Sequence, residues 1–435
     1  MKQIVVIGGG PAGSVAAAML AKYSSDAEVL LVEKDRHPRH HVGESLQPAT
    51  FDILDQHFGL KDLLTQQGYA NKFGAVYIWG ENREPWRIVF DERLEKSVDD
   101  LSEAELLSGG FEQAWQVDRE SFDQILFENA RNQGVKIIEQ VAVQKIELDA
   151  SHAKVEKIFL ANGEILQPDF VVDATGQSAL LGRKMGWKST VEDLKSVAVY
   201  GYFQNTGALQ GALGRHVQLV VSVPDGWLWF IPISKEITSI GLVTQAGRKI
   251  DEAEFLEIIT NSELPLGDGE LIEKSGQRIF YAKDWSYACR KMVGENFVLV
   301  GDAACFVDPI LSGGVDFAIR GGANAALAII HQDRNALMEY EQGLLQEYQA
   351  YLRMARYWYG NNRSVQGFFW EAHQQMHQHS MSTPLRAFVY LTSGKYAADR
   401  HFKIFQKWQE EIMFQSLGVN KEPLIRKLQQ RKKGV

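Results

Sequence analysis

The feature that most constrains the fold of this chain is a glycine-rich turn directly after its first apolar run. Residues 4–7 are apolar, Gly8-Gly9-Gly10-Pro11-Ala12-Gly13 follows them, and residues 14–22 have a helical pattern. A second apolar run then ends at Glu33. A strand, a turn, a helix and a second strand in this order predict a βαβ unit with parallel strands.

Each position of the motif G-x-G-x-x-G has a physical task. Gly8 permits the tight turn, Gly10 lets the backbone approach a pyrophosphate, and Gly13 allows the helix to pack closely on the strand. Pro11 and Ala12 lie within this turn, and the N-terminus of the helix that follows favours a bound anion. Glu33 can accept hydrogen bonds from ribose hydroxyls. These residues together predict a dinucleotide-binding site.

A second strand much further along the chain favours FAD over NAD as the bound cofactor. Residues 297–300 have the pattern of a buried strand ending in Gly301-Asp302, and residues 314–330 have a helical pattern. Ligands of open α/β sheets bind beyond the carboxyl ends of such strands, where Asp302 can hold the ribityl or phosphate part of a flavin. A helix cap is the alternative role for this aspartate. Because the sequence contains no second strand-linked glycine fingerprint, reduced flavin would come from another protein.

The periodicity changes between these cofactor segments. Runs such as residues 216–223 and 227–233 are short and β-rich, which predicts a mostly antiparallel sheet in a separate lobe. We therefore predict three parts, namely a discontinuous cofactor domain, a β-rich substrate domain and a C-terminal helical region. The first comprises residues 1–75, 105–185 and 285–335, the second 76–104 and 186–284, and the third 336–435.

Composition favours a globular cytoplasmic protein with no nucleic-acid substrate. The chain has 435 residues, of which 45% are hydrophobic and 23% charged, and a formal net charge of −9. Its two cysteines, Cys289 and Cys305, have neither metal-ligand spacing nor the pattern of a disulfide framework, so no metal site is predicted. No uncharged apolar run reaches the roughly 18 residues of a membrane span. The basic C-terminal end is typical of a solvated tail and contains Lys427, Arg431, Lys432 and Lys433.

Four motifs, in order along the chain, carry a specific resemblance. Gly43-Glu44-Ser45-Leu46-Gln47-Pro48 is similar to G-E-S-x-x-P, and Asn71-Lys72-Phe73-Gly74 is similar to a lysine segment that follows it. Trp227-Leu228-Trp229-Phe230-Ile231-Pro232 matches W-x-W-x-I-P, and residues 306–314 match F-x-x-P-x-x-S-x-G. The chain thereby resembles the flavin-dependent halogenases, within the wider family of aromatic-hydroxylase-like flavoproteins, over residues 1–335.

The resemblance implies a fold and a set of flavin contacts. The fold is α/β, with a Rossmann-like FAD-binding domain of the aromatic-hydroxylase type, an inserted and mostly antiparallel β-sheet substrate domain, and a C-terminal helical region. Trp227 and Trp229 would separate the flavin from the substrate and discourage ordinary monooxygenation, although an aromatic strand in a sheet core is the simpler interpretation. Further FAD contacts are implied at Ser45, Arg119, Asp302, Pro309, Gly313 and Gly314.

The segment Ser312-Gly313-Gly314 is the candidate halide site. It stands directly before a predicted helix, so its backbone N–H groups would lie at the positive end of the helix dipole, beside the flavin. A helix-entry turn with flavin contacts alone is the alternative.

Lys72 is the candidate catalytic residue. Lysine has an unperturbed pKa of about 10.4, and desolvation lowers that pKa by up to several units. A protonated lysine could polarise hypohalous acid, a neutral one could form a haloamine, and the sequence leaves both open. The alternative is a solvated loop lysine. Glu44 is a second candidate acid near the flavin, with a structural role as its alternative.

The implied reaction uses FADH2, O2 and chloride or bromide. FADH2 from a separate NAD(P)H-dependent flavin reductase would react with O2 to give a flavin C4a-hydroperoxide, whose terminal oxygen the halide attacks. The resulting hypohalous acid would cross to Lys72, where an electron-rich ring takes the halogen. Because Leu311 stands where halogenases of free tryptophan typically have an acidic residue, we expect a phenol, pyrrole or indole-like substrate, free or tethered to a carrier protein. A homodimer is compatible with the sequence.

Two rival functions stay open, the first within the flavoenzymes and the second in another class. A flavin-dependent aromatic monooxygenase or a prenyl reductase is one, since prenyl reductases share Gly301-Asp302 and a related aromatic-proline stretch; Lys72 and Ser312 disfavour it. The other is a binding or regulatory protein with a flavoprotein fold that has lost turnover. Such a protein would bind flavin but show no dependence on oxygen or halide.

Overall fold

The computed structural model of the chain describes residues 2–81, 83–224, 226–283, 286–360, 365–375 and 383–416. The basic tail that contains Lys427, Arg431, Lys432 and Lys433 lies outside these residues.

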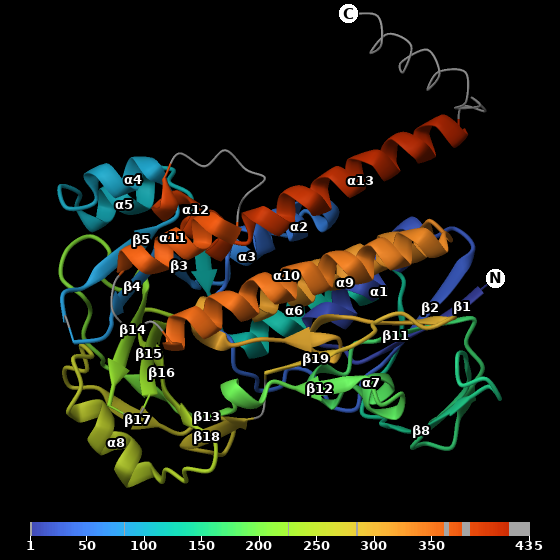
Figure 1. Ribbon diagram of the computed structural model, residues 1–435, viewed down its shortest axis with the longest axis horizontal. Coiled ribbons are helices and arrows are strands. Elements are labelled where there is room, and N and C mark those ends of the chain that lie inside the picture. The colour runs from blue at the N-terminus through green and yellow to red at the C-terminus, as the bar shows by residue number, and fades with distance from the viewer. Residues whose placement is uncertain are drawn as a thin grey trace, which may run out of the picture.

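A five-stranded sheet with the strand order β20-β11-β1-β2-β7 forms the centre of one half of the molecule (Figure 1). Every neighbouring pair in it is parallel. Its strands are β1 (Lys2–Ile7), β2 (Ala27–Val32), β7 (Lys136–Ile138), β11 (Phe170–Asp173) and β20 (Phe297–Leu299). The apolar runs predicted near both ends of the chain therefore meet in one sheet, as a discontinuous Rossmann-like domain requires.

Helix α1 (Pro11–Tyr23) is central to this half, because residues 11–20 are all buried. It packs against α9 (Gly314–Ile330) at a distance that small residues permit, since a Cβ added at Gly322 would lie 2.3 Å from the backbone oxygen of Ala12. Helix α6 (Arg119–Asn132) begins at Asp118, whose side chain accepts a hydrogen bond from the N–H of Glu120. Three further helices are α2 (Pro48–Phe58), α3 (Lys61–Thr65) and α7 (Leu180–Lys184).

An eight-stranded sheet forms the second half, with the order β17-β13-β16-β15-β14-β4-β5 and β18 paired to β13. All its pairings are antiparallel except β14 with β4. Its strands are β4 (Gly74–Ile78), β5 (Trp86–Val89), β13 (Ser196–Gln204), β14 (Gln218–Val223), β15 (Gly226–Pro232), β16 (Ile237–Gln245), β17 (Glu270–Ile272) and β18 (Ile279–Lys283). The predicted mostly antiparallel sheet is confirmed.

Three helices accompany this sheet: α4 (Glu92–Ser97), α5 (Glu103–Ser108) and α8 (Glu252–Thr260). Helix α4 and the first two residues of α5 fall where β-rich structure was expected. Their capping explains the difference: Asp91 caps α4, and Ser102 forms a capping box with Glu105 on α5.

Three small sheets complete the β-structure. One contains β8 (Val143–Leu148), β9 (Val155–Leu160) and β10 (Ile165–Leu166), and another β12 (Lys188–Thr190), β19 (Tyr287–Cys289) and β21 (Cys305–Phe306). The third is the ribbon of β3 (Ala70–Lys72) and β6 (Ala114–Gln116), which carries Lys72.

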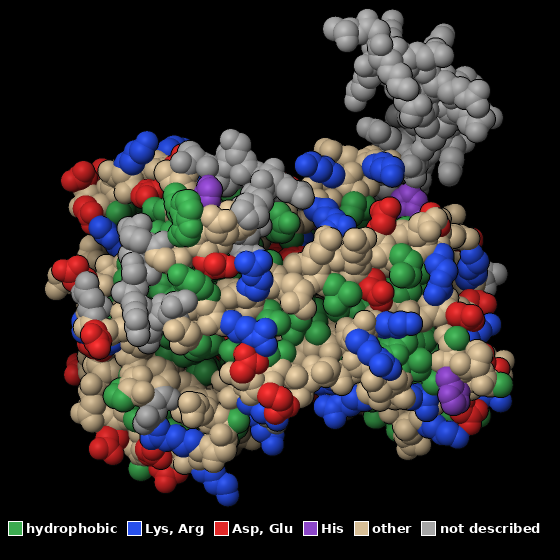
Figure 2. Space-filling model, viewed as in Figure 1, with side chains coloured by type: hydrophobic (Ala, Val, Ile, Leu, Met, Phe, Trp, Pro, Cys, Tyr) green, Lys and Arg blue, Asp and Glu red, His purple; other side chains and the backbone are tan. Residues whose placement is uncertain are grey.

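The C-terminal region is helical, as predicted, and lies along one side of both halves (Figure 1). It comprises α10 (Arg334–Gly360), α11 (Val365–Gln375), α12 (Pro384–Thr392) and α13 (Lys395–Ser416). Buried polar contacts join it to α9: Arg320 donates to Glu347 at 2.5 Å, and a ring nitrogen of His401 lies 2.7 Å from Asn324. Among the described helices, none has the length and apolar character needed to cross a membrane. The face in Figure 2 carries lysine, arginine, aspartate and glutamate side chains interspersed.

Candidate active site

One cavity of about 550 Å³ brings together residues from both halves of the molecule. It lies beyond the carboxyl ends of the parallel strands and against the face of the large sheet, where α/β proteins bind their ligands. The site residues predicted from the sequence that line it are Gly8, Gly10, Pro11, Ala12, Glu33, Glu44, Ser45, Arg119, Trp227, Trp229, Asp302, Pro309, Ser312 and Gly314. Gly13, Lys72 and Gly313 are not among its lining residues.

The glycine fingerprint fits a dinucleotide at this cavity. A Cβ added at Gly8 would lie 2.3 Å from the carbonyl oxygen of Ala174, and one at Gly13 would lie 1.9 Å from that of Gly8. Both glycines are therefore required by the packing of the turn itself. Gly10 differs, because it faces the cavity and a Cβ there would meet no backbone atom, the nearest atom being Arg39 Nη2 at 3.4 Å.

Two backbone hydrogen bonds fix the carboxylate of Glu33 at the same turn. Its Oε2 accepts from the N–H of Gly9 at 2.5 Å, and its Oε1 accepts from the N–H of Asp35 at 2.8 Å. Each carboxylate oxygen retains a further lone pair, so the ribose hydroxyls predicted as its partners can still bind.

Arg39 is a candidate cofactor-site residue that sequence reasoning missed. It lines the cavity, its guanidinium faces Gly10, and its buried Nε has no hydrogen-bond partner among the described residues. An unpaired guanidinium nitrogen beside a glycine turn fits the negative charge of a pyrophosphate. A single arginine in a loop has no motif, so the sequence offered no signal for it.

We expect Arg39→Ala to weaken FAD binding at least about tenfold, because it removes a charge-assisted hydrogen bond worth roughly 1.5–3 kcal/mol. Quenching of flavin fluorescence on titration measures the Kd. Arg36→Ala is the matched control, since Arg36 is exposed in the same loop and should leave the Kd unchanged. Equal effects of the two substitutions would remove Arg39 from the cofactor site.

Arg119 is hydrogen-bonded to the loop that carries Glu44. Its Nε and Nη2 donate to Asp123 at 2.7 and 2.9 Å, and its Nη1 donates to the carbonyl of Val42 at 2.6 Å. The carboxylate of Glu44 accepts from the hydroxyl of Tyr202 at 2.9 Å and is 1% exposed. Glu44 thus has a well-defined structural role, and its role as an acid stays a prediction.

Asp302 follows the end of β20, within a short 3-10 turn, and its side chain does not cap that turn. It faces the cavity, where burial raises the pKa of its carboxyl to about 6 against the opposing effects of Arg119 and Lys188. This position favours the flavin-contact interpretation over the helix-cap one.

The two tryptophans of β15 both line the cavity and belong to the hydrophobic core. Trp227 Nε1 donates to the hydroxyl of Tyr359 at 2.9 Å, and that hydroxyl donates to Asp308 at 2.9 Å. Trp229 pairs across the sheet with Gly241, where a Cβ would lie 2.3 Å from the indole. Both tryptophans therefore belong to the sheet core and line the cavity, and their separation of the flavin from the substrate stays a prediction.

The start of α9 supplies free backbone donors to the cavity. The N–H of Phe317 donates to the carbonyl of Gly313, so the N–H groups of Gly314 and Val315 precede the first helical hydrogen bond. Gly314 and Val315 line the cavity. Gly313 instead backs onto Tyr351, whose ring would lie 3.0 Å from an added Cβ. Of the two glycines predicted to frame a halide, Gly314 is the one that faces the cavity.

Lys72 lies outside this cavity and is 3% exposed, so the solvated-loop interpretation is wrong. Its Nζ donates to the carbonyl of Leu46 at 2.9 Å and lies 5.6 Å from the centre of the Phe90 ring. Burial lowers the pKa of this amine to about 7. Leu46 directly follows Ser45, which lines the cavity, so the lysine is hydrogen-bonded to the residue next to the cavity wall.

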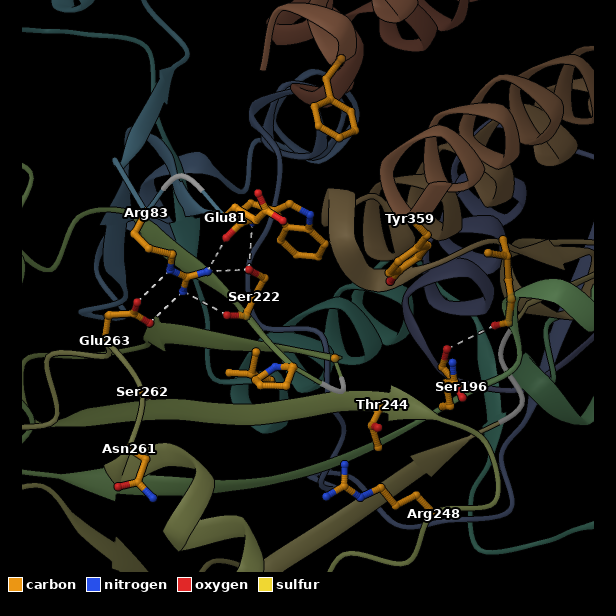
Figure 3. A pocket seen from close by; sticks show the side chains of 18 of the residues that line it. Glu81, Arg83, Ser196, Ser222, Thr244, Arg248, Asn261, Ser262, Glu263 and Tyr359 are labelled. Carbon is orange, nitrogen blue, oxygen red and sulfur yellow. Dashed lines mark hydrogen bonds and ion pairs between the residues drawn. The ribbon is translucent and has the colours of Figure 1, made fainter. Parts of the chain in front are cut away.

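A second, larger hollow of about 1940 Å³ is lined by residues of the large sheet, among them Ser222 and Thr244, and by Tyr359 of α10 (Figure 3). None of the site residues predicted from the sequence lines it. Its basic side chains already have acidic partners: Arg83 pairs with Glu263, and Arg248 pairs with Glu254. It adjoins the first cavity through Tyr359, the partner of Trp227. Among the described residues, no His, Cys, Asp or Glu cluster is arranged to hold a metal ion.

Comparison with known proteins settles the family. The family model described as tryptophan halogenase matches residues 3–103 and 92–430. The chain belongs to this family. It is 30% identical to a tryptophan 2-halogenase of Chondromyces crocatus over 86% of this chain and 71% of that protein. It is 31% identical to the 1H-pyrrole-2-carbonyl-[peptidyl-carrier protein] chlorinase of Pseudomonas fluorescens over 76% of each.

Similarity to a solved structure agrees with the assignment of the chain to this family. The myxobacterial chondrochloren halogenase CndH, described as FAD-dependent, shares 29% identity and a TM-score of 0.74, with 84% of each chain covered. The α/β fold and the predicted membership of the flavin-dependent halogenases are thereby confirmed. The chain is an FAD-dependent halogenase of aromatic substrates, which uses FADH2, a halide ion and O2.

Proposed function

We propose that this halogenase holds its halide at the N-terminus of α9 and passes the oxidised halogen to Lys72, whose side chain reacts as a neutral amine. The observation that carries the proposal is the division of the site. The fingerprint, the tryptophans and the α9 N–H groups share one cavity, whereas Lys72 is buried beyond its wall at Leu46. The flavin contacts and the lysine are thus separated by protein.

Bound FADH2, with O2, supplies the oxidation that converts halide to hypohalous acid. The amine nitrogen of Lys72 then attacks the halogen, an N–X bond forms, the X–O bond breaks, and hydroxide takes a proton from nitrogen to leave as water. An electron-rich ring carbon next takes the halogen and loses a proton, which regenerates the amine. Burial favours this neutral form, and no carboxylate contributes to the pKa of Lys72.

The substrate we propose is a phenol, pyrrole or indole-like ring, free or tethered to a carrier protein. Leu311 stands before the motif serine and is 4% exposed, so this position provides no carboxylate for the ammonium group of a free amino acid. The chlorinase relative, whose name specifies a pyrrole carbonyl on a peptidyl-carrier protein, supports a tethered substrate.

We expect the purified chain to oxidise NADH negligibly when mixed with FAD in air, because the sequence has one dinucleotide fingerprint and FAD occupies it. Absorbance at the nicotinamide band measures this. Addition of an NAD(P)H-dependent flavin reductase should start halogenation. Rapid NADH oxidation by the chain alone would contradict a two-component system.

The test of the function is mass spectrometry of an aromatic panel after incubation with FAD, a flavin reductase, NADH and bromide. The panel includes phenols, pyrroles, indoles, free tryptophan and a carrier-bound pyrrole carbonyl. Brominated phenol, pyrrole or indole products support the proposal. Hydroxylated products would indicate a monooxygenase, and a brominated product from tryptophan alone would contradict the proposed substrate class.

A further inference from the structure

A buried glutamine on the large sheet joins three segments of the site. Gln218, the first residue of β14, is 4% exposed and lines the cavity. Its Oε1 accepts from the hydroxyl of Ser45 at 2.5 Å and from the hydroxyl of Ser312 at 2.6 Å. Its side chain also forms a hydrogen bond with Tyr77 on the neighbouring strand β4. Residues far apart in sequence therefore share one amide.

The count of protons and lone pairs determines what these serines can still do. An amide oxygen has two lone pairs, so two hydroxyls saturate Oε1 of Gln218. A hydroxyl has one proton, and Ser312 has committed it to Gln218. A halide accepts hydrogen bonds and needs donors, so it would bind the N–H groups of Gly314 and Val315 rather than Ser312. The task of Ser312 in this arrangement is to tie its loop to Gln218.

The same glutamine is linked to the lysine segment. Ser45, which it binds, precedes the residue whose carbonyl accepts from Lys72. On the other side, the N–H of Phe73, the residue after Lys72, donates to the carbonyl of His216 at 2.8 Å. Gln218, two residues later, pairs in register with Ala75. Gln218 is therefore connected to Lys72 in two ways, through Ser45 and Leu46 and through His216 and Phe73.

Ser312 also has an unusual backbone. Its φ is +53°, in the left-handed region that non-glycine residues rarely adopt. This conformation turns the chain from the 3-10 turn at residues 309–311 into α9. The hydrogen bond to Gln218 fixes the side chain of Ser312 at this turn. That turn sets the direction of the N–H groups of Gly314 and Val315.

We infer that Gln218 is a positioning residue for halogenation, which sets the halide loop at a fixed place relative to Lys72 by accepting from both Ser45 and Ser312. This inference rests on the proposed role of the α9 N-terminus as the halide site. The link between the halide loop and Lys72 would then be a residue of β14, a strand without a recognised motif.

Gln218→Met tests the inference, because methionine keeps the length of the side chain but accepts no comparable hydrogen bond. Three quantities are measured: the Kd of FAD, the Kd of bromide from titration of the absorbance of bound oxidised FAD, and product formed per FADH2 oxidised. We expect at least a tenfold rise in the bromide Kd and a tenfold loss of product per FADH2, with the FAD Kd within twofold. Ser222→Ala is the control on the same strand, at the hollow of Figure 3, and should change none of them beyond twofold.

Two further variants separate positioning from general damage. Gln218→Glu retains acceptors for both serines but places negative charge beside the halide, so the bromide Kd should rise at least tenfold, and less so as the pH is lowered. Ser312→Ala should match Gln218→Met, and the double variant should be no worse than either alone, because both remove the same link.

The outcomes distinguish this inference from the proposed function. An unchanged bromide Kd in both Gln218 variants, or additive effects of Gln218→Met and Ser312→Ala, would overturn the inference. So would parallel losses of FAD affinity and thermal stability in Gln218→Met. If the wild-type chain forms no halogenated product, the proposed function fails, yet the bromide titration still decides whether Gln218 sets the halide loop. A wild-type chain that binds no bromide would overturn both.

Discussion

Replacement of Lys72 by alanine is expected to lower aromatic halogenation at least ~10²-fold, the loss typical of removing a positioned acid-base group. FAD affinity and the oxidation of FADH2 by O2 should stay within twofold, because Lys72 does not line the flavin cavity. Single-turnover assays that follow product and reduced flavin separately measure both. Lys61→Ala is the matched control, since Lys61 is exposed. Full activity in Lys72→Ala would remove this lysine from the mechanism.

Arginine at the same position distinguishes the two forms of the amine. Lys72→Arg keeps a positive charge but is effectively never deprotonated, so it cannot form the haloamine, and it should be as inactive as the alanine variant. Substantial activity in Lys72→Arg would instead favour hydrogen bonding to hypohalous acid by a protonated side chain. Lys72→Met, which preserves most of the buried stem, checks that loss of packing alone does not explain the result.

The pH dependence has a definite sign. Burial lowers the pKa of Lys72 to about 7, so the neutral amine is scarce below that pH and dominant above it. The wild-type rate of halogen transfer should therefore rise with pH up to about 7 and level off beyond it. Measurement of single-turnover halogenation between pH 5.5 and pH 8.5 (about 1.5 pH units on either side of the pKa) tests this. A rate that falls above pH 7 would require the protonated form.

Gly314→Val is expected to raise the bromide Kd at least ~10-fold while changing the FAD Kd by less than about threefold. The valine Cβ would lie 2.6 Å from the ring of Phe306, so the first turn of α9 must shift and its N–H groups lose their direction. Titration of each ligand measures the two constants.

Gly313→Ala is the control for that experiment, because its Cβ points to Tyr351 rather than into the cavity and Gly313 has a negative φ of −90°. We expect a smaller effect on the bromide Kd than at Gly314. Equal loss of halide and FAD binding in Gly314→Val would show that the segment builds only the flavin pocket, which is the alternative that the sequence left open.

Most of the site residues that the sequence predicted line the cavity, because the motifs describe local constraints. The spacing of Gly8 and Gly13 follows from atoms within one turn, and the tryptophans of β15 follow from an alternating strand in a recognised motif. The sequence missed Arg39 and Gln218, since neither belongs to a motif and each acquires its role from neighbours in other segments. It also treated Gly313 and Gly314 alike, and the direction of each depends on the turn at Ser312.

The sequence by itself predicted a nucleotide site at the first βαβ turn, a flavin as the cofactor, and one lysine and one serine-glycine segment as candidates for the chemistry. Tertiary structure decided what those candidates can do. Burial lowers the pKa of the Lys72 amine to about 7, and the amine contacts Leu46 and Phe90, which lie on other segments. The hydroxyl of Ser312 is oriented because it donates a hydrogen bond to a glutamine on β14. Desolvation and hydrogen-bond saturation depend on everything within a few ångströms, and such neighbours are brought together by folding, not by order along the chain.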